Sequence, residues 1–295
     1  SNIDLVSKVP RLPKMGETLI GHLFHMGYGG KGANQAVMAA KLGAAVTMIT
    51  KVGRDVFGEG TVKNYQEQGI DTTWVMFDET RFSGVATILV DDSGRNMLVV
   101  VPGANMGLSP RDIQAARKVI LEAEVLVCQL EVPVETTMEA FRIAREGGVM
   151  TILNPAPAGP IPNELLQLSD ICAPNETETE TLTGMTVGTL EEVEKAAQAL
   201  LTRGPRSVII TLGERGALLV DHENGTVFEP AIEVDAVDTT GAGDAFIGSL
   251  AYFLAEGRSL REAVRRANAA AAISVTKIGT QVSFPTRDEI LDIVT

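Results

Sequence analysis

The sequence predicts an α/β protein with a central, mostly parallel sheet, helices on both faces of that sheet, and a small antiparallel β lid. From about Leu108 onward, short Val/Ile/Leu-rich segments alternate with longer segments of helical periodicity, as in parallel sheets. In the first third, apolar and polar residues alternate as in antiparallel strands. The 295 residues, 45% of them hydrophobic, suffice for one large core. We therefore expect one domain, residues 1–295, with lid strands from about 5–28 and 83–101.

Four apolar segments are predicted to be buried strands of the parallel sheet. They are Val125–Glu131, Val149–Leu153, Asp170–Pro174 and Ser207–Leu212. Apolar residues recur at helical spacing in Pro133–Arg145 and Leu190–Arg203, which lie between these strands. Another helix is expected to begin at Pro110, because Ser109 is a good N-cap and Asp112 stands where a capping box needs an acid.

Turn residues separate the predicted antiparallel strands. The lid strands are expected at Thr18–Met26, Ser83–Val90 and Asn96–Val101. Asp91–Gly94 is the turn between the last two of these strands. Asn224-Gly225 indicates a second hairpin, with strands at Ala217–Val220 and Thr226–Phe228.

The charge of the chain limits the classes of partner. A net charge of −13 and a pI near 4.8 argue against a nucleic-acid partner, which requires a basic face to neutralise phosphates. Lysines and arginines are scattered, so we expect no membrane-binding patch. No apolar segment reaches membrane-spanning length and no secretory leader opens the sequence. We expect a cytoplasmic protein.

The cysteines and histidines do not suggest a metal site or a disulfide framework. Cys128 and Cys172 lie in apolar segments without metal-ligand spacing, so we expect buried thiols in a reducing compartment. The three histidines have no carboxylate or cysteine partner at useful spacing, and surface or lid positions are expected for them. They are His22, His25 and His222.

The segment Asp238-Thr239-Thr240-Gly241-Ala242-Gly243-Asp244 carries the strongest chemical signal. It opens a helix in which Phe246, Leu250 and Phe253 share one face. The free N–H groups of such a turn and the helix dipole make an anion site suited to a transferring phosphoryl group. An ordinary capped helix start would look similar. Asp244 favours catalysis, because a carboxylate beside bound phosphate is useful only if it accepts a proton from a hydroxyl nucleophile.

A second glycine-rich turn, Gly29-Gly30-Lys31-Gly32-Ala33-Asn34-Gln35, leads into a helix that should stop before Gly43. It is not a P-loop, because His25 and Gly32 stand where that pattern requires glycine and Ser/Thr. Gly27, Gly29 and Gly32 satisfy GxGxxG, which leaves dinucleotide binding as an alternative. We favour glycines that let the backbone approach a polar ligand, with Lys31 and Asn34 as donors; a plain helix entry stays open.

The segment Asn175-Glu176-Thr177-Glu178 follows a predicted strand and opens another helix. Its carboxylates should lie at the carboxyl edge of the sheet, where ligands bind in α/β folds. Mg²⁺ prefers such oxygens, often through water. A solvated acidic helix start would explain the same residues.

Four motifs occur in an order and spacing that resemble those of the ribokinase (PfkB-type) family of sugar kinases. They are Asn2-x-Asp4, Gly29–Gln35, Asn175-x-x-Glu178 and Asp238–Asp244. The resemblance runs nearly end to end. Further segments resemble the members that phosphorylate ribose, namely Cys128–Glu131, Asn154–Pro157 and Gly279–Gln281. The resemblance implies a ribokinase-like fold and ATP-dependent phosphorylation of D-ribose at its 5-hydroxyl to ribose 5-phosphate.

The resemblance also implies a role for individual residues. Ribose would contact Asn2, Asp4, Gly30, Lys31, Asn34 and Glu131, beneath lid residues Ala86, Ile88 and Val100. ATP would contact Asn175, Thr211, Gly213, Gly216 and Asn268. Gly241, Ala242 and Gly243 would form the anion hole beside Asp244, which would deprotonate the sugar.

Metal ions and a dimer are further implications of the resemblance. Glu178 would organise Mg²⁺. A K⁺ site would use, mostly through backbone carbonyls, Asp238, Thr240, Ser274, Lys277, Gly279 and Ser283. Two copies would form a homodimer through their lids.

One departure from the family concerns the start of the sequence. Relatives have a hydrophobic strand that ends in glycine just before the Asn-x-Asp segment, whereas this sequence begins at Ser1. We expect either a truncation or a sheet that lacks one interior strand. Asn2 and Asp4 are expected near a free terminus.

Three alternative functions stay open. A family kinase for deoxyribose, fructose or a nucleoside would keep the same catalytic motif, since substrate identity depends on a few hydroxyl contacts. A non-catalytic sugar or nucleotide sensor is disfavoured by Asp244. An NAD-dependent oxidoreductase has only the GxGxxG match in its favour.

Overall fold

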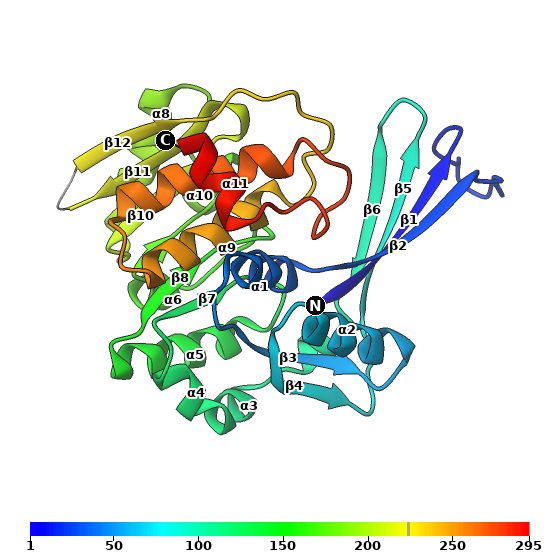
Figure 1. Cartoon of the computed structure of the whole chain (residues 1–295), viewed down its shortest axis with the longest axis horizontal. Helices are drawn as coiled ribbons and strands as arrows, with labels where there is room; N and C mark the ends of the chain where they lie inside the picture. The colour runs from blue at the N-terminus through cyan, green and yellow to red at the C-terminus, as the bar shows by residue number, and fades with distance from the viewer. Residues whose placement is uncertain (223–224, 295) are drawn as a thin grey trace.

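The computed structural model describes residues 1–222 and 225–294. The body contains a six-stranded sheet, and a four-stranded lid sheet projects from it (Figure 1). The strands of the body sheet, in spatial order, are β12 (Gly225–Pro230), β11 (Gly216–Asp221), β10 (Ser207–Thr211), β9 (Ile171–Cys172), β8 (Met150–Leu153) and β7 (Val125–Cys128). Strands β7 to β10 are parallel, whereas β11 and β12 form an antiparallel hairpin. The predicted α/β fold is confirmed.

Neighbouring residues of the strands point into two different helical layers. Ile152, Ile171 and Ile209 pack with α1 (Lys31–Leu42), α9 (Ala242–Ala255) and α10 (Leu260–Ser274). The next residues along two of these strands, Leu153 and Cys172, pack on the opposite face with α5 (Val134–Gly147) and α6 (Asn163–Gln167). On that face α8 (Leu190–Leu201) covers β10 and β11. Helices therefore cover both faces, as the sequence predicts.

The remaining helices lie at the edges of these layers. They are α2 (Val56–Glu67), α3 (Pro110–Ala115), α4 (Arg117–Leu121), α7 (Glu176–Thr183) and α11 (Arg287–Val294), with 3₁₀ turns at Gly103–Gly107 and Gly213–Arg215. Ser109 and Asp112 form the predicted capping box of α3. Within the described residues, no helix is long and apolar enough to cross a membrane.

Helix α9 is more deeply buried than its sequence indicates. Phe246, Leu250 and Phe253 are buried as predicted, but every residue from Asp244 to Leu254 is buried, because α9 lies between α1, α10 and the sheet. A Cβ atom at Gly248 would lie 2.5 Å from the carbonyl oxygen of Gln35. Glycine therefore allows α1 and α9 to approach closely beside the start of α9.

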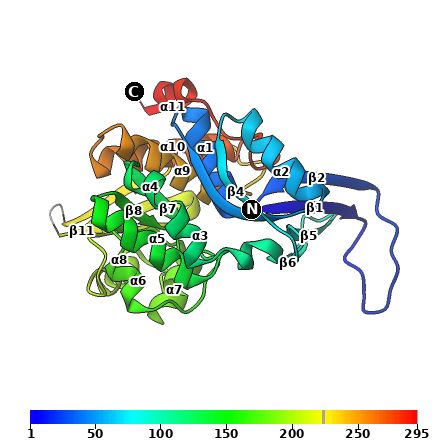
Figure 2. The ribbon, with the colours of Figure 1, turned by 90° about the horizontal axis from the view of Figure 1, so that it is seen from below.

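The lid sheet has the order β2 (Leu23–Gly29), β1 (Asn2–Val9), β5 (Gly84–Asp91) and β6 (Asn96–Val101). Strands β1 and β2 are antiparallel, as are β5 and β6, but β1 and β5 are parallel. The predicted strand at Thr18–Met26 is wrong before Leu23. Residues 10–22 instead form the connection at the far end of the lid (Figures 1 and 2).

The predicted hairpins are present. The turn after β5 is held by Asp91, whose carboxylate accepts hydrogen bonds from the amides of Ser93 and Arg95, both at 3.0 Å. Strands β11 and β12 pair as expected, although Asn224 of the predicted turn lies outside the described residues.

Strands β3 (Thr47–Gly53) and β4 (Asp71–Asp78) form a separate parallel pair. A cavity of about 560 Å³ is lined by residues of both β3 and β7, by α1 and α9, and by Ser1. The hydrogen-bonded order of strands is thus interrupted between β3 and β7.

Candidate active site

Asp244 lies in the first turn of α9, where the two predicted glycines have different functions. Gly241 is the N-cap with φ of 80°, and a Cβ atom there would lie 2.3 Å from Cγ2 of Thr280. The left-handed backbone and the close contact both require glycine. A Cβ atom at Gly243 would meet no atom within 4 Å, so the turn faces open space in front of Asp244. A ligand can therefore approach the positive end of α9.

The carboxylate of Asp244 is buried and held at both oxygens. Oδ2 accepts from Nδ2 of Asn34 (2.8 Å), and Oδ1 accepts from Nε2 of Gln35 (3.0 Å). Burial raises the pKa of Asp244, and the nearby charge of Lys31 and the two amides oppose this shift. A carboxylate with a raised pKa and a fixed orientation is suited to accept a proton.

The predicted sugar contacts lie beside this carboxylate. The amide of Lys31 donates to Oε2 of Glu131 (2.8 Å), and the side chain of Asn2 donates to Oε1 of the same residue (3.4 Å). Burial raises the pKa of Asp4 from its ordinary value of 3.8 to about 6, and the charges of Glu131 and Asp244 add to this shift. Three carboxylates from distant parts of the chain are thus brought together.

The glycines of the second motif approach the protein's own polar groups. A Cβ atom at Gly29 would lie 2.2 Å from Oδ2 of Asp4, and one at Gly30 would lie 2.7 Å from the amide nitrogen of Asn2. Gly30 has φ of 91° and is the N-cap of α1, which ends before Gly43 as predicted. The motif therefore opens a helix and also lets β2 lie close to the carboxylate of Asp4.

The predicted nucleotide contacts lie mainly at the carboxyl edge of the sheet. Asn175 follows β9 and pairs with Thr211 at the end of β10 in an isolated parallel bridge. Gly216 has φ of 116°, and a Cβ atom there would lie 2.2 Å from the carbonyl oxygen of Glu229. Asn268 on α10 donates to that same carbonyl (3.0 Å), which ties α10 to β12. Gly213 begins the 3₁₀ turn between β10 and β11.

Glu178 is buried and is not the solvated acid that the alternative interpretation required. Its carboxylate accepts from the amide of Asn175 (2.8 Å), and its own amide donates to the Asn175 side chain (2.8 Å), which forms a capping box. Burial raises its pKa. The described residues contain no group of three or more His, Cys, Asp or Glu side chains that could hold a metal ion. A carboxylate is the kind of oxygen ligand that Mg²⁺ takes in proteins beside water and phosphate oxygens.

The predicted cation segment is folded around Asp238. Its carboxylate accepts from the amides of Thr240 (3.0 Å) and Gly279 (2.9 Å). The hydroxyls of Ser274 and Ser283 donate to backbone carbonyls of Ala271 and Thr280, both at 2.8 Å, and Nζ of Lys277 contacts Glu289 at 3.2 Å. Backbone carbonyls are thus the groups of this segment suited to a monovalent cation.

Sequence reasoning missed the amides around Asp244. They are Gln35, Asn64, Gln129, Asn154 and Gln281. All of these except Asn64 occur in segments that carry the family resemblance, and this position was the available signal. The bonds themselves join residues far apart in the chain.

The histidine and cysteine predictions have mixed outcomes. His22 and His25 are exposed on the lid and His222 is exposed, as expected. The expectation that no carboxylate accompanies them is wrong for His22, whose Nε2 lies 3.1 Å from Oδ1 of Asp92. Cys172 is buried as expected, whereas Cys128 is only partly buried. Both are free thiols, and burial raises the pKa of each to about 12.

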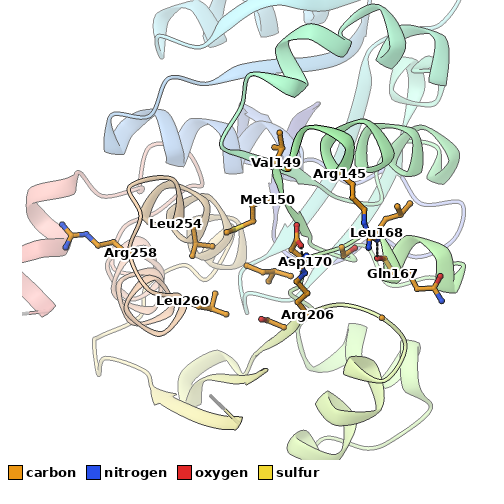
Figure 3. A pocket seen from close by; sticks show the side chains of 15 residues that line it. Arg145, Val149, Met150, Gln167, Leu168, Asp170, Arg206, Leu254, Arg258 and Leu260 are labelled. Atoms are coloured by element: carbon orange, nitrogen blue, oxygen red, sulfur yellow. Dashed lines mark hydrogen bonds and ion pairs between the residues drawn. The ribbon is translucent and has the colours of Figure 1, made fainter. Parts of the chain in front are cut away.

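A second pocket lies at the opposite edge of the sheet, where β8, β9 and β10 begin (Figure 3). Arg145 donates to the carbonyl of Gln167 (2.7 Å), and Arg206 pairs with Asp170 (3.3 Å). The side chain of Arg206 is 81% exposed, and Arg258 points away from the pocket. Its cations are engaged or solvated, so this pocket is not the candidate active site.

The fold and the site together are those of a carbohydrate kinase. A protein-family model for the pfkB family carbohydrate kinases matches residues 1–287, and the chain belongs to this family.

Relatives named as kinases of two different sugars match nearly the whole chain. Ribokinase from Mus musculus is 44% identical over 291 residues, with 97% of this chain and 90% of the relative covered. Deoxyribokinase from Salmonella typhi is 42% identical over 292 residues, with 97% and 94% covered. The chain is thus similar to kinases of both sugars.

Solved structures are similar over the same extent. Arabidopsis thaliana ribokinase complexed with ribose and ATP has a TM-score of 0.93 at 32% identity, with 100% of this chain and 96% of that chain covered. Escherichia coli phosphofructokinase-2 in complex with potassium has a TM-score of 0.81 at 26% identity, with 99% and 95% covered. The fold is ribokinase-like.

Replacement of Asp4 by asparagine should stabilise the protein at high pH. The folded-state pKa near 6 exceeds the ordinary value of 3.8, so the ionised carboxylate costs folding free energy above pH 6. The cost fades as pH falls below that value, because folded Asp4 becomes protonated. We expect Asp4→Asn to raise the free energy of unfolding by roughly 2–3 kcal/mol at most near pH 8 and little near pH 4.

Urea unfolding followed by the fluorescence of Trp74 measures this difference at both pH values. Asp235→Asn is a matched control, since Asp235 is an exposed aspartate outside the helices and strands. An equal effect of Asp4→Asn at the two pH values would contradict the prediction.

Proposed function

We propose that the chain is an ATP-dependent ribokinase that phosphorylates the 5-hydroxyl of D-ribose. The observation that carries the proposal is the carboxylate of Asp244, held by two amides at the open, glycine-lined start of α9. The similarity to a ribokinase complexed with ribose and ATP supports the choice of both substrates.

In the proposed reaction Asp244 takes the proton of the 5-hydroxyl as the oxygen attacks the γ-phosphorus. The bond between that phosphorus and the β,γ-bridging oxygen breaks, and ADP leaves with the electron pair. Amides of Gly241, Ala242 and Gly243 stabilise the charge that spreads over the phosphoryl oxygens. Glu178 would hold Mg²⁺, which would neutralise charge on the phosphates.

The sugar and the nucleotide are held by the two groups of residues described above. Ribose contacts Asn2, Asp4, Gly30, Lys31, Asn34 and Glu131, with Ala86, Ile88 and Val100 of the lid above it. ATP contacts Asn175, Thr211, Gly213, Gly216 and Asn268. The bridge between Asn175 and Thr211 supports this grouping, because it joins two of the nucleotide contacts directly.

Deoxyribokinase is the second candidate function. The 42% identity to a deoxyribokinase is close to the 44% identity to a ribokinase, so overall similarity does not separate the two sugars. The catalytic residues would be the same in both cases.

The variant Asp244→Asn tests whether Asp244 is the catalytic base. Asparagine keeps the size of the side chain and loses its basicity, so we expect turnover to fall by about a hundred- to ten-thousand-fold, with folding and ATP affinity nearly unchanged. Asp288→Asn, at an exposed position, is the control. Turnover above about a tenth of the wild-type value, under conditions where chemistry limits the rate, would remove Asp244 from the role.

Comparison of ribose with deoxyribose tests the substrate and the role of Asp4. A site built to bond a hydroxyl disfavours an analogue that lacks it by about 1–3 kcal/mol, so kcat/KM for deoxyribose should be about tenfold lower or worse. Asp4→Ala should lower kcat/KM for ribose more than kcat/KM for deoxyribose, and so reduce the preference for ribose. The four values of kcat/KM form a cycle that isolates the coupling.

Two results of this comparison would change the assignment. Equal efficiency for both sugars in the wild type would favour a broader pentose kinase or a deoxyribokinase. An unchanged ratio in Asp4→Ala would remove Asp4 as the reader of the 2-hydroxyl. A wild type that consumes no ATP with any pentose, hexose or nucleoside would instead indicate a sensor.

K⁺ is proposed to bind the segment around Asp238 and to fix the turn that carries the anion hole. The bond between Asp238 and Gly279 and the potassium complex of phosphofructokinase-2 support this proposal. Preorganisation of the turn should appear in kcat rather than in the KM for ribose. Equal rates in K⁺, Na⁺ and a large organic cation at matched ionic strength would contradict it.

A homodimer through the lids is also proposed. Five consecutive hydrophobic residues of β6, Met97–Val101, are each at least 46% exposed, which is unusual for a solvated strand. Val99 pairs with Thr87 and lies on the face opposite Ala86 and Val100, because neighbouring residues of a strand alternate between faces. Val99→Lys should therefore produce a monomer in sedimentation velocity, and an unchanged dimer or a monomeric wild type would argue against this interface.

A further inference from the structure

Side-chain amides form a chain that ends on Asp244. Gln281 donates to Oδ1 of Asn34 (3.0 Å), and Asn34 donates to Oδ2 of Asp244 (2.8 Å). Asn64 donates to Oε1 of Gln281 (3.1 Å) at the start of this chain. The second oxygen of Asp244 accepts from Gln35. These amides join α1 and α2, near the start of the sequence, to α9 and the segment after α10, near its end.

The charge of Asp244 fixes the direction of every amide in this chain. An ionised carboxylate only accepts hydrogen bonds, so Asn34 must present its NH₂ group to Asp244. The oxygen of Asn34 then faces Gln281, which must also present its NH₂ group. The oxygen of Gln281 is left to accept from Asn64, as observed. If this chain of amides were reversed, the oxygen of Asn34 would face the buried carboxylate of Asp244.

Gln281 is well placed to hold this direction, because its backbone is anchored on both sides. Nζ of Lys41, on the same helix as Asn34, donates to the carbonyl oxygens of Gln281 (2.7 Å) and Phe284 (3.3 Å). Two residues before Gln281, the amide of Gly279 donates to Asp238 (2.9 Å). The side chain of Gln281 therefore joins the proposed cation segment to α1.

We propose that Gln281 is a positioning residue for Asp244, because it keeps the amide of Asn34 turned so that its NH₂ group donates to the base. Gln281 acts on Asp244 indirectly, because Asn34 lies between them in the chain of hydrogen bonds. The inference rests on the proposed role of Asp244. Loss of the orientation should lower kcat and leave the KM for ATP nearly unchanged, because Asn34 is not among the nucleotide contacts. The KM for ribose should also rise, since Asn34 is a proposed ribose contact.

Two substitutions of similar size distinguish this role from simple packing. Gln281→Met removes the amide, so Asn34 loses a partner but is not forced to turn. Gln281→Glu keeps the shape and the bond from Asn64, but its carboxylate requires the NH₂ group of Asn34 and so turns the Asn34 oxygen toward Asp244. We expect kcat to fall roughly tenfold in Gln281→Met and roughly a hundredfold in Gln281→Glu, with the KM for ATP within about threefold.

Asn64→Asp provides an independent test from the far end of the chain. An aspartate there can only accept from Gln281, so it should reverse the chain and lower kcat in the same way. Gln66→Glu is the matched control, because Gln66 is an exposed residue of the same helix and takes the same change of charge. Thermal unfolding of all variants separates loss of fold from loss of rate.

The possible outcomes are distinct for the two proposals. A Gln281→Glu enzyme at least as active as Gln281→Met, or losses confined to KM, would overturn the positioning role. Normal kcat in Gln281→Glu and Asn64→Asp, together with an inactive Asp244→Asn, would reject the amide chain and retain the base. An active Asp244→Asn enzyme would reject the base itself.

Discussion

The geometry of the site depends on the close approach of α1 and α9 at Gly248. A Cβ atom there would lie 2.5 Å from the carbonyl oxygen of Gln35 and 2.7 Å from Cβ of Met38. Overpacking a core costs about 1–3 kcal/mol, which exceeds the gain of about 1 kcal/mol from replacing a helical glycine by alanine. Glycine is thus favoured despite its poor helix propensity. The spacing that this glycine permits keeps the side chains of Asn34 and Gln35 within hydrogen-bond distance of Asp244, which lies one helical turn before Gly248.

The same packing concentrates negative charge at the site. The charge of Asp244 helps to raise the pKa of Asp4 and of Glu178, and the charge of Glu131 helps to raise that of Asp4 and of Asp244. Lys31 is the cation that opposes the shift at Asp244 and Glu178. Burial raises the pKa of Asp4, Glu178 and Asp244, so the folded protein bears a cost for keeping them ionised. Amide donors that cannot ionise offset part of this cost at Asp244. Ionised carboxylates accept hydrogen bonds, so a ligand rich in hydroxyl donors would lower this cost when it binds.

Local signals in the sequence predicted much of the fold, and nonlocal contacts account for what was missed. Buried strands such as Ser207–Leu212 and the capping box at Ser109 depend on residues close together in the chain, and both are present. Strand β1 pairs with β5 across about eighty residues, and its short alternating pattern gives no indication of parallel pairing. The bond from Gln281 to Asn34 spans 247 residues, and no periodicity or spacing encodes such a contact.

The division of the site between different elements explains why sugar identity is harder to infer than catalysis. Asp244 and its amides belong to α9, α1 and the segment after α10, and α1 and α9 pack together in the core. Asn2 and Asp4 belong to β1 of the lid, and Glu131 lies in the connection after β7. Substitutions in these elements can alter hydroxyl contacts without disturbing the base. Relatives named as kinases of ribose and of deoxyribose are accordingly about equally similar to this chain, at 44% and 42% identity.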